Sequence, residues 1–138
     1  MIAKRNFALC LVATFGFVAC GKKGMSDAGY LAAQKAIDAI TRAYEYRDNG
    51  PLYYEPRLLD AQKAVSGIPV LKDEGPEFQF KMEAETCVTL LHTYRLAVET
   101  DEWALGKAGP DSGRTYYEVA KCVRDLPSVL GRLNSSEQ

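Results

Sequence analysis

The sequence predicts an all-α fold, a small antiparallel up-down bundle of four helices whose second helix is short. Apolar residues recur at alternating steps of three and four in four separate segments, and this spacing places them on one face of a helix. No segment alternates apolar and polar residues as a half-buried strand does. The connections between the segments are short, and short connections join neighbouring helices that run antiparallel.

The first predicted helix begins after Ser26 or Asp27, either of which can cap it, and runs to about Asp48. Asn49 and Gly50-Pro51 end it, because asparagine, glycine and proline commonly follow the last turn of a helix. The apolar face of this helix consists of Tyr30, Ala33, Ile37, Ile40 and Tyr44.

The second predicted helix begins at Pro56, since proline suits the first helical position, and it ends before Gly67 and Pro69. Residues 69–75 form a linker to the third helix. The apolar face of the second helix consists of Leu58, Ala61, Val65 and Ile68.

The third predicted helix is the longest, and it begins at Pro76 and runs to about Leu105. Gly106 follows the last turn, where glycine is the commonest residue. The apolar face of this helix consists of Phe80, Ala84, Cys87, Leu91, Tyr94 and Val98.

The fourth predicted helix is capped by Asp111 or Ser112, or by Thr115, which has capping-box spacing to Glu118. Pro127 has no backbone N–H, so the sequence predicts a kink or a short break at that position. Its apolar face consists of Tyr116, Val119, Val123, Leu126, Leu130 and Leu133.

The first 19 residues have the arrangement of a secretory signal. Lys4 and Arg5 give a positive start, and an apolar run without charge follows from Phe7 to Val18. This run is too short to cross a bilayer as a helix, which takes ~20 apolar residues. An ordinary secreted protein cut near this point is one interpretation of the pattern.

The four residues Phe17-Val18-Ala19-Cys20 resemble the lipobox of bacterial lipoproteins, in which an apolar residue and two small ones precede a cysteine. The resemblance implies that residues 1–19 are removed and that Cys20 becomes an acylated N-terminus. Stable anchoring needs at least two acyl chains. Lipoproteins of this family carry three, palmitate among them, so the resemblance implies permanent attachment to the membrane. In lipoproteins of the enterobacterial kind, an aspartate directly after the lipidated cysteine retains the protein in the inner membrane. Because Gly21 stands at this position, the resemblance implies sorting to the outer membrane of a host with two membranes, with the domain facing the periplasm.

The mature chain then divides into a lipidated tether at 20–25, a helical bundle domain at 26–133 and a disordered tail at 134–138. Removal of residues 1–19 leaves 119 of the 138 residues, which suffices for one core. It also removes two basic residues, so 15 basic and 18 acidic residues give a net charge of −3. This charge offers no argument for nucleic acid as a partner. Lys22 and Lys23 either contact anionic head groups or only keep the tether soluble.

Two cysteines, Cys87 and Cys122, remain after Cys10 leaves with the signal and Cys20 takes the lipid. In an oxidising compartment this pair predicts a disulfide between the third and fourth helices. A zinc site needs four ligands, and the one histidine, His92, lies on a different face of the helix from Cys87. We therefore expect neither a metal nor a cofactor.

The sequence offers no catalytic set. Any triad must use His92, which lies mid-helix beside the apolar face and is expected to be half-exposed. We therefore expect that the protein is not an enzyme. Glu99, Asp101 and Glu102 gather near a helix C-terminus, where the dipole disfavours acids. They form either a site for a cation or basic partner, or a solvated helix end.

Most of the aromatic residues fall near the two connections at the end of the bundle opposite to Cys20. Tyrosine and tryptophan are enriched in binding hot spots, so this end is a candidate binding surface. The alternative is that the rings fill the end of the bundle. The candidate residues are Tyr46, Tyr53, Tyr54, Trp103, Tyr116 and Tyr117.

Three functions are compatible with these features. The first is a membrane-anchored interaction or structural module of the cell envelope, held by its lipid at Cys20 and contacting an envelope protein. The second is a small-ligand binder that uses the tyrosine-rich end or a gap beside the short second helix, which would need a pocket of at least ~300 Å³. The third, an enzyme, would need converging carboxylates with perturbed pKa values.

Overall fold

The structure is a computed structural model that describes residues 24–105 and 110–135, without the side chains of residues 102–105, 110 and 111. It contains four helices and, within these ranges, no strand. The predicted signal, Cys20, and Lys22 and Lys23 lie outside the described residues. The helices are α1 (Asp27–Glu45), α2 (Pro51–Ser66), α3 (Pro76–Leu105) and α4 (Pro110–Asn134).

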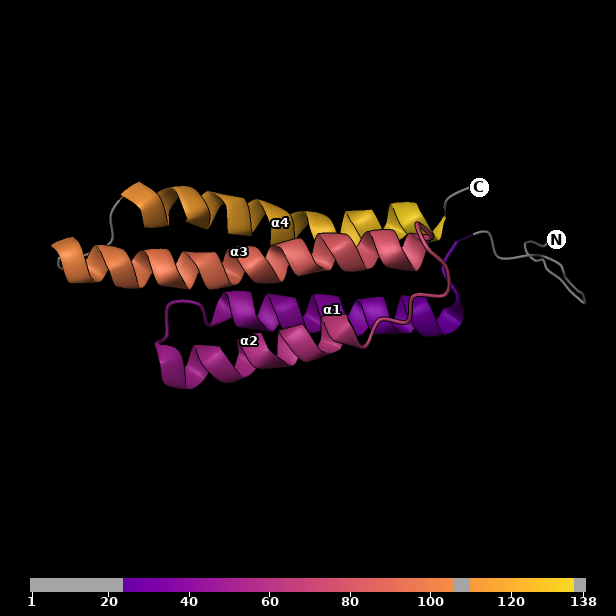
Figure 1. Ribbon diagram of the computed structural model, residues 1–138, viewed down its shortest axis with the longest axis horizontal. Helices are drawn as coiled ribbons and strands as arrows, with labels where there is room; N and C mark the ends of the chain where they lie inside the picture. Colours follow the sequence, from indigo (N-terminus) through magenta and orange to yellow (C-terminus); the bar gives the residue numbers. More distant parts are fainter. Residues whose placement is uncertain (1–23, 106–109, 136–138) are drawn as a thin grey trace, which may run out of the picture.

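The four helices form an antiparallel up-down bundle, as the sequence predicts (Figure 1). The α1–α2 connection lies at one end, and the α2–α3 connection lies at the other end with both ends of the described chain. Each helix contacts its neighbours in sequence, α4 closes the bundle against α1, and α1 also contacts α3. Among the described residues α2 and α4 make no contact, so they lie diagonally across the bundle.

Helix α1 begins as predicted. The Ser26 side chain caps it by accepting a hydrogen bond of 3.0 Å from the Gly29 N–H. The helix ends at Glu45, three residues before the predicted end. Its buried face is rotated from the predicted one, because a row of small residues packs innermost and the larger Tyr30, Ile37 and Tyr44 flank it, partly buried. The innermost residues are Ala33, Ala36, Ile40 and Ala43.

Helix α2 begins at Pro51, so the predicted start at Pro56 is wrong by five residues. Pro51 takes the first helical position, and Gly50 precedes it with a φ of 93°, a conformation that glycine adopts without strain. Pro56 then lies inside the helix, where it leaves the Leu52 carbonyl without an N–H partner. Both residues are exposed, so water can take that place. The predicted apolar face of α2 is buried.

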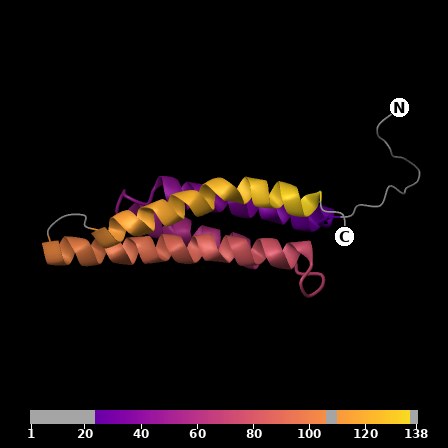
Figure 2. The same ribbon diagram turned by 90° about the horizontal axis from the view of Figure 1, so that it is seen from above.

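Helix α3 has the predicted bounds, and all six residues of its predicted apolar face are buried. Helix α4 begins at Pro110, before the predicted caps Asp111, Ser112 and Thr115, so the predicted start is wrong by a few residues. It continues through Pro127 to Asn134, so of the kink or short break predicted at Pro127 the break is absent. Figure 2 shows α4 as one bowed ribbon. Pro127 is exposed, and the loss of one hydrogen bond on the solvent side does not interrupt the helix.

The predicted disulfide between α3 and α4 is present. Cys87 and Cys122 are bonded, with their Cα atoms 5.6 Å apart, inside the range that disulfides require. Cys87 is fully buried in the core, and Cys122 packs against its edge. The bond therefore fixes the register of the two longest helices in the middle of the bundle. Figure 1 shows α3 extending beyond the first turn of α4.

Candidate functional site

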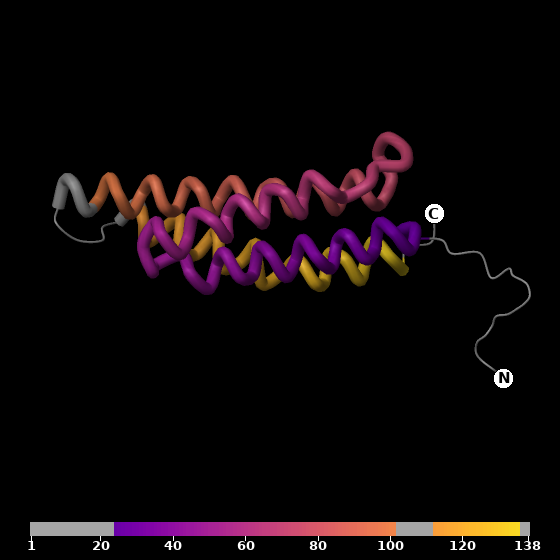
Figure 3. Tube along the Cα trace, turned by 90° about the horizontal axis from the view of Figure 1, so that it is seen from below, coloured from indigo at the N-terminus to yellow at the C-terminus, as the bar shows by residue number. Residues whose placement is uncertain are grey.

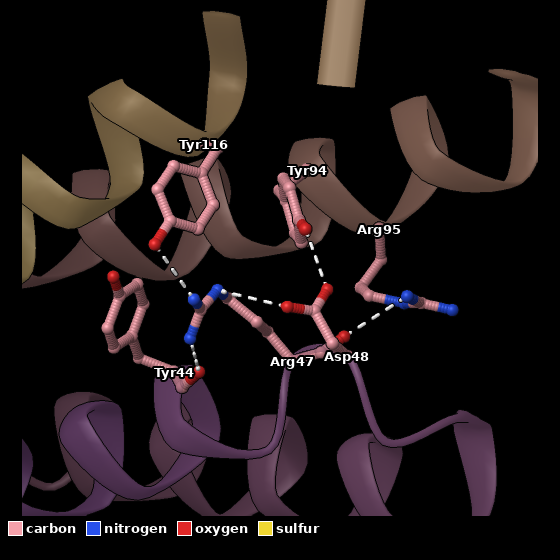
Figure 4. Close-up of polar contacts among 6 residues, drawn as sticks. All are labelled: Tyr44, Arg47, Asp48, Tyr94, Arg95 and Tyr116. Atoms are coloured by element: carbon pink, nitrogen blue, oxygen red, sulfur yellow. Dashed lines mark hydrogen bonds and ion pairs between the residues drawn. The ribbon is translucent and has the colours of Figure 1, made fainter. Parts of the chain in front are cut away.

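The tyrosine end of the bundle, which holds the α1–α2 connection and the rings of Tyr44, Tyr94 and Tyr116, is built around Arg47. The Arg47 guanidinium donates hydrogen bonds to the Tyr44 carbonyl oxygen at 2.8 Å and to the Tyr116 hydroxyl at 3.1 Å (Figure 4). It also lies 4.0 Å from the centre of the Tyr44 ring and 4.8 Å from that of Tyr116. Such cation–π contacts are favourable in a partly buried place. Arg47 thereby links the end of α1 to α4.

Asp48 links the same connection to α3. The Tyr94 hydroxyl donates a hydrogen bond of 2.7 Å to one Asp48 carboxylate oxygen, and the Arg47 Nε lies 3.6 Å from the other (Figure 4). Arg95 of α3 donates a hydrogen bond of 3.1 Å to the Arg47 carbonyl oxygen. The α1–α2 connection is therefore tied to both α3 and α4 by charge-assisted hydrogen bonds, which are stronger than neutral ones.

The tyrosines of this end hold their protons tightly. Burial, reinforced by the hydrogen bond to Asp48, raises the pKa of Tyr94 to about 12. Burial also raises the pKa of Tyr54, and burial together with the neighbouring Tyr116 hydroxyl raises that of Tyr44. At neutral pH these phenols are uncharged. The hydroxyls of Tyr94 and Tyr54 donate hydrogen bonds between α3 and the first helix pair, and these bonds hold the helices together.

Tyr54 belongs to the core and not to a surface, which corrects the prediction for this residue. Its side chain is 3% exposed, and its hydroxyl donates a hydrogen bond of 2.9 Å to the Leu91 carbonyl oxygen of α3. Tyr46 is partly buried, and the Arg57 guanidinium lies 3.8 Å from the centre of its ring. Both rings serve to seat α2 against the bundle.

The structure does not bring the six candidate residues together into one surface. Tyr53 of α2 and Tyr117 of α4 are 55% and 75% exposed, but their helices lie diagonally across the bundle. Tyr116 is half-buried and engaged with Arg47, and the side chain of Trp103 lies outside the described residues. The alternative interpretation, that most rings fill the end of the bundle, holds for Tyr54 and Tyr116.

Sequence reasoning missed the arginines that organise this end. Arg47 and Arg57 each follow a tyrosine by three residues, at Tyr44 and Tyr54, and Arg95 follows Tyr94 directly. The spacing of three was a usable signal for the Arg47–Tyr44 contact alone, because residues three apart near a helix end are neighbours. Arg57 lies instead over the ring of Tyr46, and Arg95 over that of Tyr54, and these contacts follow no short spacing in the sequence.

The acidic cluster of α3 has a structural use. The Asp101 carboxylate is buried and accepts a hydrogen bond of 3.0 Å from the Ser112 N–H. Asp101 thus stabilises the first turn of α4, where the helix dipole favours an acid. The exposed Glu99 lies 3.9 Å from the largely buried Arg95 as an ion pair, and the side chain of Glu102 lies outside the described residues. Within the described residues no group of three or more His, Cys, Asp and Glu is arranged to hold a metal ion.

A groove of about 270 Å³ runs between α2 and α3 near the tyrosine end. Its walls include the exposed apolar residues Leu59 and Leu96, and His92 lies exposed on its rim. Glu55, Glu99 and Arg95, the ion-pair partner of Glu99, also line the groove and give it a net charge of −1. This groove matches the gap beside the short second helix that the sequence suggested.

The opposite end, where Gly24 enters the fold, is held firmly. Met25 is fully buried, and the Ser26 N–H donates a hydrogen bond of 2.7 Å to the buried Glu77 carboxylate of α3. Gly24 packs on the Asn134 backbone of α4 so closely that a Cβ would overlap it. The start of the described chain is therefore clamped between α3 and α4.

Comparison of the chain with protein-family models, with curated proteins and with solved structures finds no match. Of the helices in residues 24–105 and 110–135, none combines the length and the apolar character needed to span a bilayer.

Proposed function

We propose that this protein is a lipoprotein of the cell envelope that is anchored through Cys20 and acts as a non-catalytic interaction module. The observation that carries the proposal is that the end of the bundle at which the chain enters and the proposed contact surface lie apart. The chain enters the fold at Gly24, four residues after the lipobox cysteine. Exposed apolar residues lie at both ends of the bundle, and one group of them lies on α2 and α3 away from Gly24. These residues are Leu52, Tyr53, Leu59 and Leu96.

The α2–α3 groove is the proposed contact for the partner. Its exposed Leu59 and Leu96 offer apolar surface, and the net negative charge of its lining, from Glu55 and from Glu99 paired with Arg95, favours basic residues beside it. An amphipathic partner segment with apolar anchors and flanking lysine or arginine has the complementary chemistry. This surface replaces the predicted tyrosine surface, whose rings are divided between the core and two separate faces.

A small-ligand function has less support. The tyrosine end is filled by the Arg47 guanidinium between two rings. The α2–α3 groove of about 270 Å³ is near the lower limit of ligand pockets, ~300 Å³, and the larger hollow of about 680 Å³ lies at the Gly24 end, away from both places that the sequence suggested. An enzymatic function has even less support. The buried hydroxyls of Tyr94 and Tyr54 stay protonated and are bonded to other groups of the fold, so they do not face a substrate. Gly21 after the lipidated cysteine favours the outer membrane, with the domain in the periplasm.

Photo-crosslinking in living cells tests the interaction surface. A benzophenone amino acid at Leu96 should give a discrete crosslinked product with an envelope protein. Met82 is the matched control, because it lies on the same helix, is also 51% exposed and lines a groove between α3 and α4 instead. The same crosslinking pattern at both positions, or no product at Leu96 or Leu59, would contradict the proposed surface.

A further inference from the structure

The Gly24 end of the bundle presents exposed apolar side chains in the α2–α3 connection, residues 67–75. Leu71 is 65% exposed and its neighbour Val70 is also exposed. Leu71 and Gly24 line the same hollow, which has a volume of about 680 Å³. Figure 3 shows this connection curling outward at the end where the described chain begins. The exposed pair therefore lies beside the point at which the tether meets the fold.

The tether gives this end little freedom to turn away from a membrane. Because Met25 is buried and the Ser26 N–H is bonded to Glu77, the fold begins immediately after Gly24. Gly24 follows Cys20 by four positions, and four fully extended steps of the chain span only ~14 Å. With its lipid in a bilayer, Cys20 would hold Gly24 within ~14 Å of the head groups, and the α2–α3 connection lies beside Gly24.

We propose that Val70 and Leu71 insert into the interface of the phospholipid bilayer that holds the Cys20 lipid, as a second membrane contact that sets the orientation of the bundle. This inference rests on the proposed lipid anchor. Exposed apolar side chains at an interface bury themselves at the boundary between head groups and acyl chains. The contact would stand the bundle on the membrane with the α2–α3 groove directed away from it.

The charges around the pair indicate an apolar contact and not an electrostatic one. Lys72, Asp73 and Glu74 follow Leu71 and are all exposed, with a net charge of −1. This charge does not attract anionic lipids, so the contact should form equally on zwitterionic bilayers and should persist at high salt.

Quenching by brominated lipid tests the insertion. The lipidated protein would carry Trp103→Phe with Leu71→Trp, and would be reconstituted into phosphatidylcholine vesicles with and without acyl-brominated phosphatidylcholine. The matched control carries Trp103→Phe with Leu52→Trp, at an 86% exposed leucine on the far end of the bundle. We expect brominated lipid to quench the tryptophan at 71 and to leave the one at 52 unchanged.

Flotation of the vesicles separates failure of this inference from failure of the anchor. A protein that does not float with the vesicles contradicts the lipid anchor, and it also contradicts the second contact, which depends on that anchor. A protein that floats but shows no quenching at 71, or equal quenching at 71 and 52, overturns the second contact alone. Loss of the quenching at high salt would also overturn it, because an apolar contact is not screened. Leu71→Ser removes the larger apolar side chain of the pair and should therefore weaken insertion. A spin label at position 70 should then report a shallower depth in the bilayer than it does beside Leu71.

Discussion

The Arg47 guanidinium of the α1–α2 connection donates a hydrogen bond of 3.1 Å to the hydroxyl of Tyr116, which lies 69 residues further along the chain in α4. This bond crosses from the first helix pair to the last helix. Together with the Tyr94–Asp48 bond of 2.7 Å, it fixes the α1–α2 connection to the second helix pair. The tyrosine end is thus closed by polar contacts that the aromatic rings partly shield from water.

Substitution of Arg47 by alanine should destabilise the fold. The change removes two side-chain hydrogen bonds and two cation–π contacts, and it leaves Asp48 without its ion-pair partner. We expect a loss of about 2 kcal/mol in the free energy of unfolding, measured by urea denaturation. Arg124→Ala is the control, because Arg124 is a largely exposed arginine of α4 and should change stability by less than ~0.5 kcal/mol. Equal effects of the two substitutions would show that Arg47 has no special role.

Alkaline pH should destabilise the protein through its buried tyrosines. The folded state raises the pKa of Tyr94 from 10.0 to about 12, so the unfolded chain releases this proton first. The stabilising contribution is therefore fully present below pH 10 and is lost as the pH rises toward 12. Urea midpoints measured across this range should fall, and Tyr94→Phe should make the fall shallower. A midpoint that does not change above pH 10 would contradict this assignment.

The regular parts of the fold were predictable from the sequence because a periodic apolar pattern depends only on local spacing. The apolar face of α3 from Phe80 to Val98 is such a pattern. The disulfide between Cys87 and Cys122 followed instead from the number of cysteines that remain after Cys10 and Cys20 are assigned. The start of α2 was not predictable in the same way. Pro51 and Pro56 both suit a first helical position, and the choice between them depends on the positive φ of Gly50.

The tyrosine end shows why surface and core residues were harder to separate. Topology placed the rings at one end, but the burial of Tyr54 depends on a carbonyl group of α3, which is distant in sequence. The position of Tyr116 likewise depends on Arg47 from a connection without apolar periodicity. Contacts between an irregular connection and two other helices leave no regular spacing in the sequence.

A methyl group at Gly29 should loosen the clamp at the Gly24 end. A Cβ at this position would lie 2.6 Å from the Glu77 Cγ, so the carboxylate would have to move away from the Ser26 N–H. We expect Gly29→Ala to destabilise the protein by ~1–3 kcal/mol in urea denaturation. Gly131→Ala in α4 meets no atom within 4 Å and should be neutral or stabilising, since alanine favours a helix. A stabilised Gly29→Ala variant would show that the clamp adjusts freely.

The lipid anchor at Cys20 is tested most directly by the intact mass of the protein extracted from membranes of producing cells, with Cys20→Ser alongside. The wild-type mass should equal that of residues 20–138 with acyl chains attached. The variant should carry no lipid and should not be cut before residue 20. A wild-type chain that begins elsewhere or bears no acyl chain, or a Cys20→Ser variant that is still acylated, would contradict the anchor and the proposed function that depends on it.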